Sequence, residues 1–318
     1  MYFLGVESGG TKTTAVLSDI AGATVRTVQM GAGNVSVSGR ERTRELINEI
    51  VARLLENESI ESIRWATLGF AGAGRQAEKQ ILAEILIRLG LHHFTVMTDA
   101  ELLYVATFDQ DRGMLLISGT GSVCVIRNRQ NQFEQIGGWG YILGDEGSGY
   151  DIGRMAIRQA LFEVESRAVP SALTNELLTF YKCTHPRELV TTLFSKGNPQ
   201  NRTASCAQLV CQRAAEDDSM AQGIVSSAAT SLIQLCQWAI KRMEAGPPIP
   251  LSLAGGILHS DSPVTAAFKR QARDLQLDFQ YQQPRISPVA AAVLHSVRQS
   301  GESVGEGLVI RMQDLNFN

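Results

Sequence analysis

Two short segments of the chain combine glycines with hydroxyl side chains: residues 5–13 (GVESGGTKT) and residues 117–122 (ISGTGS). Turns of this composition leave backbone N–H groups uncovered, and their hydroxyls add donors, so each segment could grip the phosphates of a nucleotide. The first segment is not a P-loop, because Thr11 stands where that pattern needs lysine and Lys12 follows it. A tight β-turn uses the same residue types, so either segment alone leaves a purely structural role open.

One aspartate stands where a general base would be useful. Asp99 ends the apolar segment FTVMTD and precedes a segment of helical character, AELLYVATF. A carboxylate at the end of a strand could accept the proton of a substrate hydroxyl while that oxygen attacks a γ-phosphate. Aspartate also caps helices well, so a capping role is the alternative.

A glycine-dense segment at residues 137–153 (GGWGYILGDEGSGYDIG) resembles a ligand loop, because so many glycines are costly to order in a loop of purely structural purpose. Trp139 could stack on the face of a sugar, and Asp145 could accept hydrogen bonds from its hydroxyl or amide groups. The alternatives are core packing for Trp139 and capping of the following helix for Asp145 and Glu146.

A further glycine pair follows the apolar segment IPLSLA. Gly255 and Gly256 come where a strand is expected to end, and ligands of open α/β sheets bind beyond the carboxyl ends of strands. Two glycines there would let a flat adenine ring approach the backbone. Close packing between a strand and a helix is the alternative use of such a pair.

The elements that must position these residues form a repeated pattern. Residues 2–18 and residues 113–129 share one layout, an apolar strand, a Gly/Ser/Thr turn and a second apolar strand. Apolar spacing predicts helices over residues 42–57 and 77–90 and strands over 63–72 and 93–100. Two halves of similar order predict a duplicated α/β fold in two domains around a nucleotide-binding cleft, with the division within the polar segment 108–113.

Composition narrows the class of protein. The chain has 318 residues, 44% of them hydrophobic, and a net charge of −3, which argues against binding to nucleic acid. The sequence predicts no membrane-spanning run and no signal peptide. The five cysteines form no CxxC pair, so we expect reduced thiols, a cytoplasmic protein and no structural metal site.

The four glycine-rich segments, in this order, resemble the sugar-kinase branch of the actin/hexokinase/Hsp70 superfamily, and more narrowly the BadF/BadG/BcrA/BcrD ATPase family with its N-acetylglucosamine kinases. GVESGGTKT and LISGTGS match the two phosphate loops, GGWGYILGDEGSGY the most specific signature, and LAGGI the adenosine motif. The resemblance covers residues 2 to about 300. It implies the ribonuclease H-like fold in duplicate, with domains at 1–110 and 111–286 and a helix at 287–300 that packs back on the first domain.

The resemblance also implies roles for individual residues. Asp99 would be the catalytic base and also contact the sugar. The ATP contacts would be Gly10, Thr11, Lys12, Gly119, Thr120, Gly121, Gly255 and Gly256. The other sugar contacts would be Asn34, Gly138, Trp139, Gly140 and Asp145. Magnesium would accompany ATP and neutralise phosphate charge, with Glu7 acting through a water in place of the usual aspartate.

The implied reaction is ATP-dependent phosphorylation of N-acetylglucosamine at its 6-hydroxyl. Glucosamine, N-acetylmuramic acid or another hexose are alternative substrates, and Glu101 and Leu102 could alter the sugar pocket. Two functions of a different class are a sugar-sensing regulator and an iron–sulfur activator of 2-hydroxyacyl-CoA dehydratases. The intact phosphate loops and Asp99 argue against the regulator, and the absence of a plausible cysteine cluster motif argues against the activator. Relatives often form homodimers, so a homodimer is a further expectation.

Overall fold

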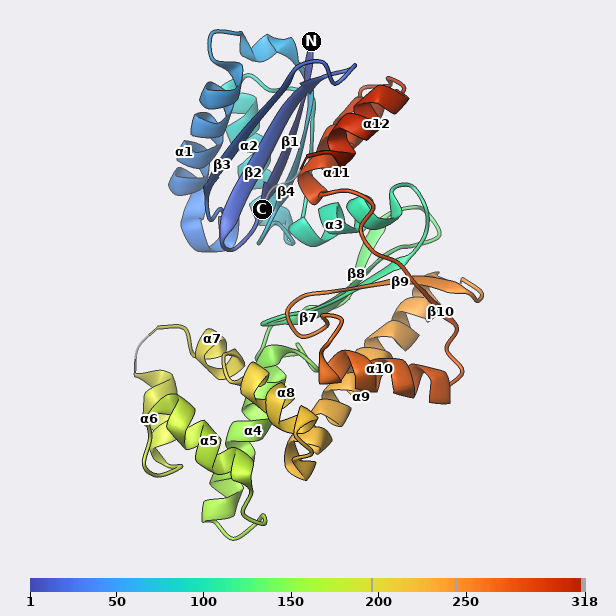
Figure 1. The fold of residues 1–318 in the computed structure, drawn as a ribbon. Helices are drawn as coiled ribbons and strands as arrows, with labels where there is room; N and C mark the ends of the chain where they lie inside the picture. Colours follow the sequence, from blue (N-terminus) through green and yellow to red (C-terminus); the bar gives the residue numbers. More distant parts are fainter. Residues whose placement is uncertain (196, 244, 316–318) are drawn as a thin grey trace. The chain divides into compact units, whose positions relative to one another are not determined.

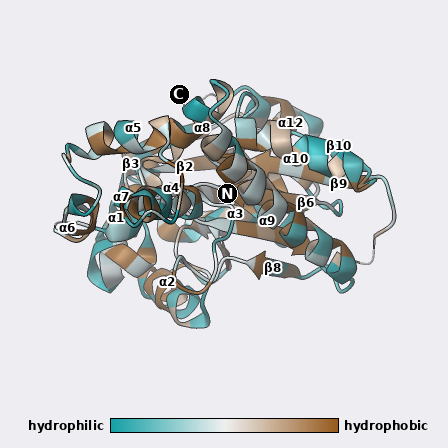
Figure 2. Cartoon of the chain, turned by 90° about the horizontal axis from the view of Figure 1, so that it is seen from below, coloured by the Kyte–Doolittle hydropathy of each residue, from teal (hydrophilic) through white to brown (hydrophobic). Residues whose placement is uncertain are grey.

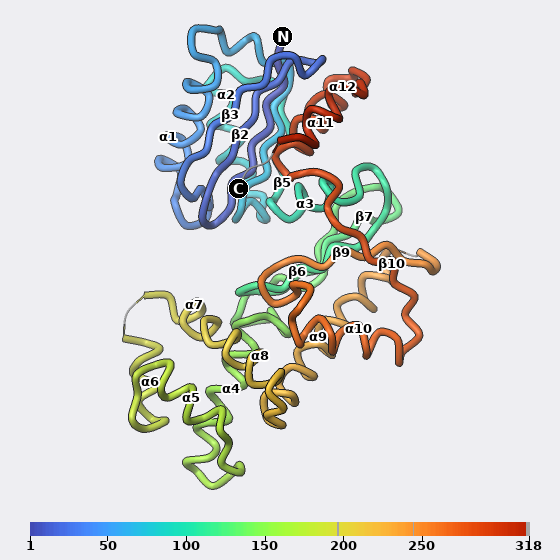
Figure 3. The backbone as a smooth tube through the Cα atoms, in the orientation of Figure 1, coloured from blue at the N-terminus to red at the C-terminus, as the bar shows by residue number. Residues whose placement is uncertain are grey.

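The computed structural model describes residues 1–195, 197–243 and 245–315, and its chain divides into two compact units. Unit 1 consists of Met1–Asp111 together with Gln283–Asn318, and unit 2 of Arg112–Gln282. Each unit is built on a five-stranded mixed sheet with helices (Figure 1). The backbone trace in Figure 3 shows how the chain leaves unit 2 after its last strand and adds two final helices to unit 1.

The sheet of unit 1 has the strand order β3-β2-β1-β4-β5. Strands β1, β2 and β3 form an antiparallel meander, whereas β4 runs parallel to β1 and β5 parallel to β4. A strand, not a helix, follows the first glycine-rich turn, which confirms that this turn is not a P-loop. The elements of unit 1 are β1 (Tyr2–Ser8), β2 (Lys12–Asp19), β3 (Val25–Gly31), α1 (Val35–Leu55), the 3-10 turn η1 (Ile60–Ser62), β4 (Ile63–Phe70), α2 (Gln76–Leu89), β5 (Phe94–Met97), α3 (Asp99–Phe108), α11 (Pro288–Gln299) and α12 (Glu306–Gln313).

The sheet of unit 2 has the order β10-β9-β6-β7-β8. Read in chain order, this is the arrangement of unit 1, with an antiparallel meander followed by two parallel strands. The structure therefore confirms the duplicated α/β fold. The elements of unit 2 are β6 (Met114–Ser118), β7 (Ser122–Arg127), β8 (Phe133–Gly137), α4 (Gly149–Val164), α5 (Ala172–Tyr181), α6 (Glu188–Phe194), α7 (Pro199–Ala204), α8 (Ala207–Ala215), α9 (Ser219–Met243), β9 (Ile249–Ala254), α10 (Pro263–Asp274) and β10 (Phe279–Tyr281).

Side chains of β1 point alternately to the two faces of its sheet and join a different hydrophobic cluster of unit 1 on each face. Leu4 and Val6 join the cluster formed with α1 and α2, whereas Phe3 joins the cluster formed with α11 and α12. Gly5 lies directly beneath α11, and a Cβ atom there would come within 2.7 Å of the carbonyl oxygen of Val289. This close approach explains the need for glycine in the middle of a buried strand.

Most of the buried apolar residues described in unit 2 form one large cluster that includes α9. By length and composition α9 could cross a membrane, but half of its most apolar stretch is buried inside the protein, as in a core helix of a globular fold. The colouring of Figure 2 shows hydrophobic and hydrophilic residues mixed along the helices of the chain, as expected of helices that pack with one face. All five cysteines are free thiols, and Cys124, Cys206 and Cys236 are buried, as expected.

Candidate active site

Sheet topology gathers the candidate residues of unit 1 at one edge. Because β1, β4 and β5 are parallel neighbours, the loops after all three leave the sheet on the same side, which we call the carboxyl edge of unit 1. Ser8 pairs with Phe70, so the end of β1 is level with the end of β4. Asp99 follows β5 at this edge, two residues after Met97.

Hydrogen bonds hold the first and last residues of the first glycine-rich turn, whereas the residues at its tip are exposed. The buried hydroxyl of Ser8 lies 2.7 Å from that of Thr13 and donates to the carbonyl of Gly33 at 3.0 Å. The turn itself closes through a 2.9 Å bond from the N–H of Gly9 to the carbonyl of Lys12. The candidate phosphate contacts Gly10, Thr11 and Lys12 are exposed. The turn can therefore present its donors without losing its shape.

Asn34 lies at the same edge, where α1 begins. Its side-chain oxygen accepts hydrogen bonds from the backbone N–H groups of Ser36 and Val37, at 3.0 and 3.3 Å. The amide oxygen is thus occupied by helix capping, and the nitrogen is the group that can donate to a ligand. Helix α1 starts earlier than the sequence predicted and is kinked at Gly39, so that Asn34 stands directly before a separate first turn.

Asp99 is the first residue of α3, but it does not cap the helix. The cap is Thr98, whose side chain accepts from the N–H of Glu101 at 3.0 Å, while the carboxylate of Glu101 accepts from the N–H of Thr98 at 2.7 Å. The capping alternative for Asp99 is therefore wrong. Glu101 is buried in this capping box and Leu102 is fully buried, so both have structural roles.

The carboxyl group of Asp99 is reachable by solvent and is also crowded by protein. Its Oδ1 accepts a 3.0 Å bond from the N–H of Ala100. Desolvation by the surrounding protein is the largest cause that raises the pKa of Asp99 above its usual 3.8, and the nearby charge of Glu101 raises it further. A raised pKa in an accessible carboxylate is what a general base requires.

Glu7 is the second carboxylate of this edge. Burial raises the pKa of Glu7, the positive charge of Lys12 lowers it, and the negative charge of Asp99 raises it again. These three groups are therefore close enough to interact electrostatically. The described residues include no cluster of three potential metal ligands. One carboxylate beside a phosphate loop nevertheless suits magnesium, which keeps several waters and is held largely by substrate phosphates.

The second glycine-rich turn, in unit 2, lies against the start of α4. The carbonyl of Gly119 accepts from the N–H of Gly149 at 2.7 Å, and the N–H of Gly119 donates to Gly121 at 2.9 Å. Beside this turn is a surface cavity of ≈ 500 Å³, a volume within the range of ligand pockets. The cavity is lined by the turn, by the segment after β9 and by the α7–α8 junction: Gly119, Thr120, Gly149, Ala204, Ser205, Ala207, Gln208, Cys211, Gly256, Ile257 and His259.

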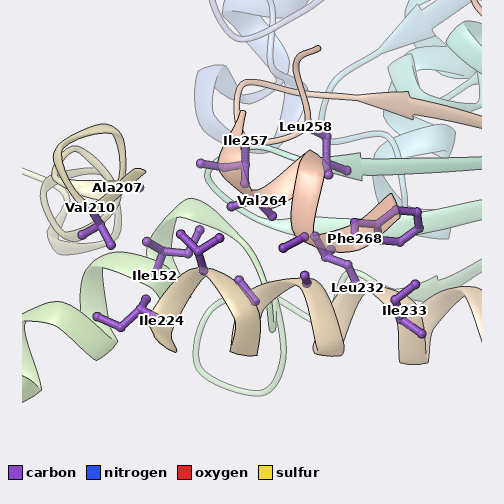
Figure 4. Close-up of a cluster of buried hydrophobic side chains, with 14 of the residues drawn as sticks. Ile152, Ala207, Val210, Ile224, Leu232, Ile233, Ile257, Leu258, Val264 and Phe268 are labelled. Carbon is purple, nitrogen blue, oxygen red and sulfur yellow. The ribbon is translucent and has the colours of Figure 1, made fainter. Parts of the chain in front are cut away.

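The glycine pair after β9 combines two functions. Gly255 has a φ of +91°, and a Cβ atom there would lie 2.3 Å from the carbonyl oxygen of Ser118. A Cβ atom on Gly256 would meet no described atom within 4 Å, and Gly256 lines the cavity. The next residues, Ile257 and Leu258, point into the hydrophobic core of unit 2 (Figure 4) and anchor the segment. Gly255 therefore packs against the end of β6 and the turn after it, not against a helix, and Gly256 has no such close contact.

In the loop before α4, Trp139 is exposed whereas Asp145 is buried. Trp139 is 75% exposed, so core packing is excluded as its role. Asp145 is buried and lies against the second glycine-rich turn, where its Oδ1 accepts from the N–H of Ser122 at 3.4 Å. Burial raises the pKa of Asp145. The helix cap is Ser148, so the capping alternative for Asp145 is wrong as well. Gly138 and Gly140 flank Trp139 with positive φ angles.

Several residues of these sites carry no recognisable sequence signal. In unit 2 the cavity wall includes Ser205, which lies between α7 and α8, and Gln208 of α8, both far from the glycine motifs in the chain. In unit 1 the segment after β4, residues 71–75, joins the carboxyl edge through a 2.8 Å bond from the N–H of Ala71 to the carbonyl of Ser8. Its AGAG pattern was the one hint in the sequence, since glycines at a strand end often mark a ligand site.

Comparison with known proteins identifies relatives over most of the chain. The model of the BadF/BadG/BcrA/BcrD ATPase family matches residues 4–293. An N-acetylmuramic acid/N-acetylglucosamine kinase of Clostridium acetobutylicum is 29% identical over 85% of this chain and 89% of its own. An N-acetyl-D-glucosamine kinase of Dictyostelium discoideum is 26% identical over 80% of this chain and 84% of its own.

Solved structures agree on the fold. A Chromobacterium violaceum protein provisionally named N-acetylglucosamine kinase superposes with a TM-score of 0.71 at 21% identity, covering 92% of this chain and 98% of its own. At this identity the similarity establishes the fold alone, which is the duplicated two-unit fold seen here.

Proposed function

Since the chain belongs to the BadF/BadG/BcrA/BcrD ATPase family, we propose that it is an ATP-dependent sugar kinase that phosphorylates an N-acetylhexosamine, with N-acetylglucosamine as the first candidate and the 6-hydroxyl as acceptor. The observation that carries the proposal is Asp99, an accessible carboxylate with a raised pKa beside an open phosphate loop. The names of the curated relatives support the sugar class. The division of the chain into two compact units supports the proposal.

The nucleotide is assigned mainly to unit 2. Gly119, Thr120 and Gly121 would bind its phosphates, and Gly256 would bound the adenosine in the ≈ 500 Å³ cavity, with Gly255 packed against Ser118 just before it. In unit 1 the open turn with Gly10, Thr11 and Lys12 would contact the transferred phosphate. Family membership implies ATP use; magnesium as its counterion, with Glu7 acting through a water, is part of the proposal.

Candidate sugar contacts are proposed in each unit separately. At the carboxyl edge of unit 1 these are Asn34, whose amide nitrogen can donate, and Asp99. In unit 2, Trp139 offers an exposed aromatic face and Asp145 a buried carboxylate, with Gly138 and Gly140 shaping the loop between strand and helix.

The chemistry follows from these assignments. Asp99 accepts the proton of the acceptor hydroxyl as that oxygen attacks the γ-phosphate, and ADP leaves with the electrons of the broken P–O bond. A divalent ion, when bound, neutralises phosphate charge. The N–H groups of the glycine-rich turns stabilise the negative charge that develops on the phosphate oxygens. Phosphoryl transfer depends mainly on positioning and on such electrostatic stabilisation.

The iron–sulfur alternative fits the thiols poorly. Cluster ligands are cysteine thiolates, and the five cysteines of the chain form no CxxC pair. A cytoplasmic location and a homodimer stay predictions, which fractionation and light scattering would test.

The test is ADP formation by the purified protein with Mg-ATP across a sugar panel. The panel contains N-acetylglucosamine, glucosamine, N-acetylmuramic acid, N-acetylmannosamine and glucose. We expect ADP formation to depend on an N-acetylated hexosamine, with the product phosphorylated at its 6-oxygen by NMR. Sugar-independent hydrolysis, or no ADP with any sugar, would overturn the proposal.

A further inference from the structure

The segment after β4, residues 71–75, occupies the middle of the carboxyl edge of unit 1. Strand β4 lies between β1 and β5 in the sheet, with Phe70 level with Ser8 and Gly69 level with Met97. The segment therefore leaves the sheet between the first phosphate loop and Asp99. None of its residues has a role in the proposed reaction.

Hydrogen bonds join this segment to the asparagine of the sugar site. The N–H of Val35 donates to the carbonyl of Ala71 at 3.1 Å, and the hydroxyl of Ser36 donates to the carbonyl of Gly72 at 2.9 Å. Gly72, with a φ of +78°, is so close to Asn34 that a Cβ atom would lie 2.4 Å from its amide oxygen. A sugar held by Asn34 would thus have Ala71 and Gly72 beside it, and Arg75 is linked to the same region through Glu78, which contacts Ser36 at 3.4 Å.

Arg75 ends this segment and is its one charged side chain. Its guanidinium is 85% exposed and pairs with Glu78 at 3.5 Å, which is longer than a direct hydrogen bond. The neighbouring cation Lys79 pairs with the buried Glu101 at 3.6 Å. A ligand can therefore reach Arg75 without disrupting an ion pair to a buried carboxylate, which is not the case for Lys79.

Glu78 is largely buried, and one of its carboxylate oxygens accepts no hydrogen bond from the described residues. Its side chain is 13% exposed, Oε1 accepts weakly from Ser36 at 3.4 Å, and Oε2 has no hydrogen-bond partner among the described residues. Such a carboxylate competes with any ligand carboxylate for Arg75 and repels it at the same time. The two side chains should therefore have opposite effects on an acidic ligand.

We propose that Arg75 is the carboxylate-binding residue of the sugar site, so that the enzyme accepts N-acetylhexosamines with an acidic substituent on the ring, such as the lactyl ether of N-acetylmuramic acid, alongside the neutral sugar. The inference rests on the proposed kinase activity. A guanidinium is the natural partner for a carboxylate, because its planar fork can donate two parallel hydrogen bonds. Glu78 sets how strongly this preference is expressed.

The experiment compares the selectivity ratio, kcat/KM for N-acetylmuramic acid over kcat/KM for N-acetylglucosamine, in the full-length enzyme and its variants. We expect Arg75→Gln to lower the ratio at least about fivefold and Glu78→Gln to raise it at least about twofold. Arg64→Gln is the matched control, because Arg64 is an exposed arginine near the opposite end of β4. Calorimetric binding of N-acetylmuramic acid to the same variants without ATP gives a readout independent of catalysis.

The signs of the two changes decide the outcome. Opposite changes in Arg75→Gln and Glu78→Gln support the inference, since a merely structural role would weaken both substrates together. An unchanged ratio in Arg75→Gln, or a wild-type enzyme that uses N-acetylglucosamine and neither phosphorylates nor binds N-acetylmuramic acid, would overturn it. An enzyme that binds N-acetylmuramic acid through Arg75 but phosphorylates no sugar would instead overturn the proposed function alone.

Discussion

Substitutions of Gly255 and Gly256 test the nucleotide site, because Gly255 packs against backbone whereas Gly256 lines the cavity. Gly255→Ala places a methyl group 2.3 Å from the carbonyl oxygen of Ser118, in a backbone conformation with φ of +91°. Gly256→Ala adds the same methyl group where no described atom lies within 4 Å, on the lining of the cavity. The first change should therefore reduce stability, and the second should reduce nucleotide affinity.

The magnitudes follow from these contacts. The left-handed conformation costs a non-glycine residue about 1–2 kcal/mol, and overpacking against backbone about 1–3 kcal/mol more. A gain of about 0.4–1 kcal/mol from the unfolded state offsets part of this for Gly255→Ala, which leaves a net loss of about 1–5 kcal/mol. For a unit of roughly 170 residues the expected fall in Tm is about 2–20 °C. In Gly256→Ala we expect an unchanged Tm and a KM for ATP raised at least about fivefold.

Two measurements on the same preparations check both expectations. Differential scanning calorimetry gives the Tm of each variant, and a coupled ADP assay at saturating sugar gives the KM for ATP. A Tm for Gly255→Ala equal to that of the wild type would refute the steric argument. A Gly256→Ala variant with normal KM for ATP would refute the placement of adenosine against this segment.

Three further results are expected. Asp99→Asn should lower kcat by about 10²–10⁴-fold while changing the Kd for the sugar much less, because the amide has the shape of the carboxylate but cannot act as a base. Wild-type turnover in this variant would exclude Asp99 as the catalytic base. In the wild type, burial raises the pKa of Asp99 and the base must be ionised, so kcat/KM should fall with decreasing pH through a midpoint above 3.8; a midpoint at or below 3.8 would contradict this. Gly5→Ala should destabilise unit 1 by about 1–3 kcal/mol in urea unfolding, since its methyl group meets backbone atoms of Val289 and Val293 at 2.7 and 2.8 Å, whereas Gly31→Ala, with no described atom within 4 Å, should not.

The parts of the fold that the sequence predicted are those with strong local patterns. Both glycine-rich turns are flanked by buried β-branched strands, so the hairpins at residues 2–18 and 113–129 could be recognised without tertiary information. Asp99 could be placed at a strand end for the same reason. The structure then rules out its capping alternative, because the neighbouring Thr98 performs that task.

The parts that the sequence did not predict depend on contacts between distant segments. The strands β3, β8 and β10 are edge strands of three to seven residues with many half-exposed or exposed side chains, so their apolar alternation is weak. Helix α12 was missed, although its Leu308 and Met312 join the core with α11. The cavity wall and residues 71–75 are ligand-site candidates because of their spatial neighbours and not because of their own composition.

The duplication also clarifies why the two halves differ in chemistry. Ser8 ends the first strand of unit 1 and Ser118 the first strand of unit 2, and both buried hydroxyls donate to a carbonyl of a neighbouring loop, at 3.0 and 2.9 Å. After the fourth strand of each sheet comes a glycine with positive φ, Gly72 or Gly255. The scaffold of the carboxyl edge is therefore the same in both copies. The candidate base, however, follows the fifth strand only in unit 1, because Gln282 and Gln283 are the two residues after the fifth strand of unit 2. A carboxylate present in one copy has no substitute in the other, which is why the loss of Asp99 should not be compensated.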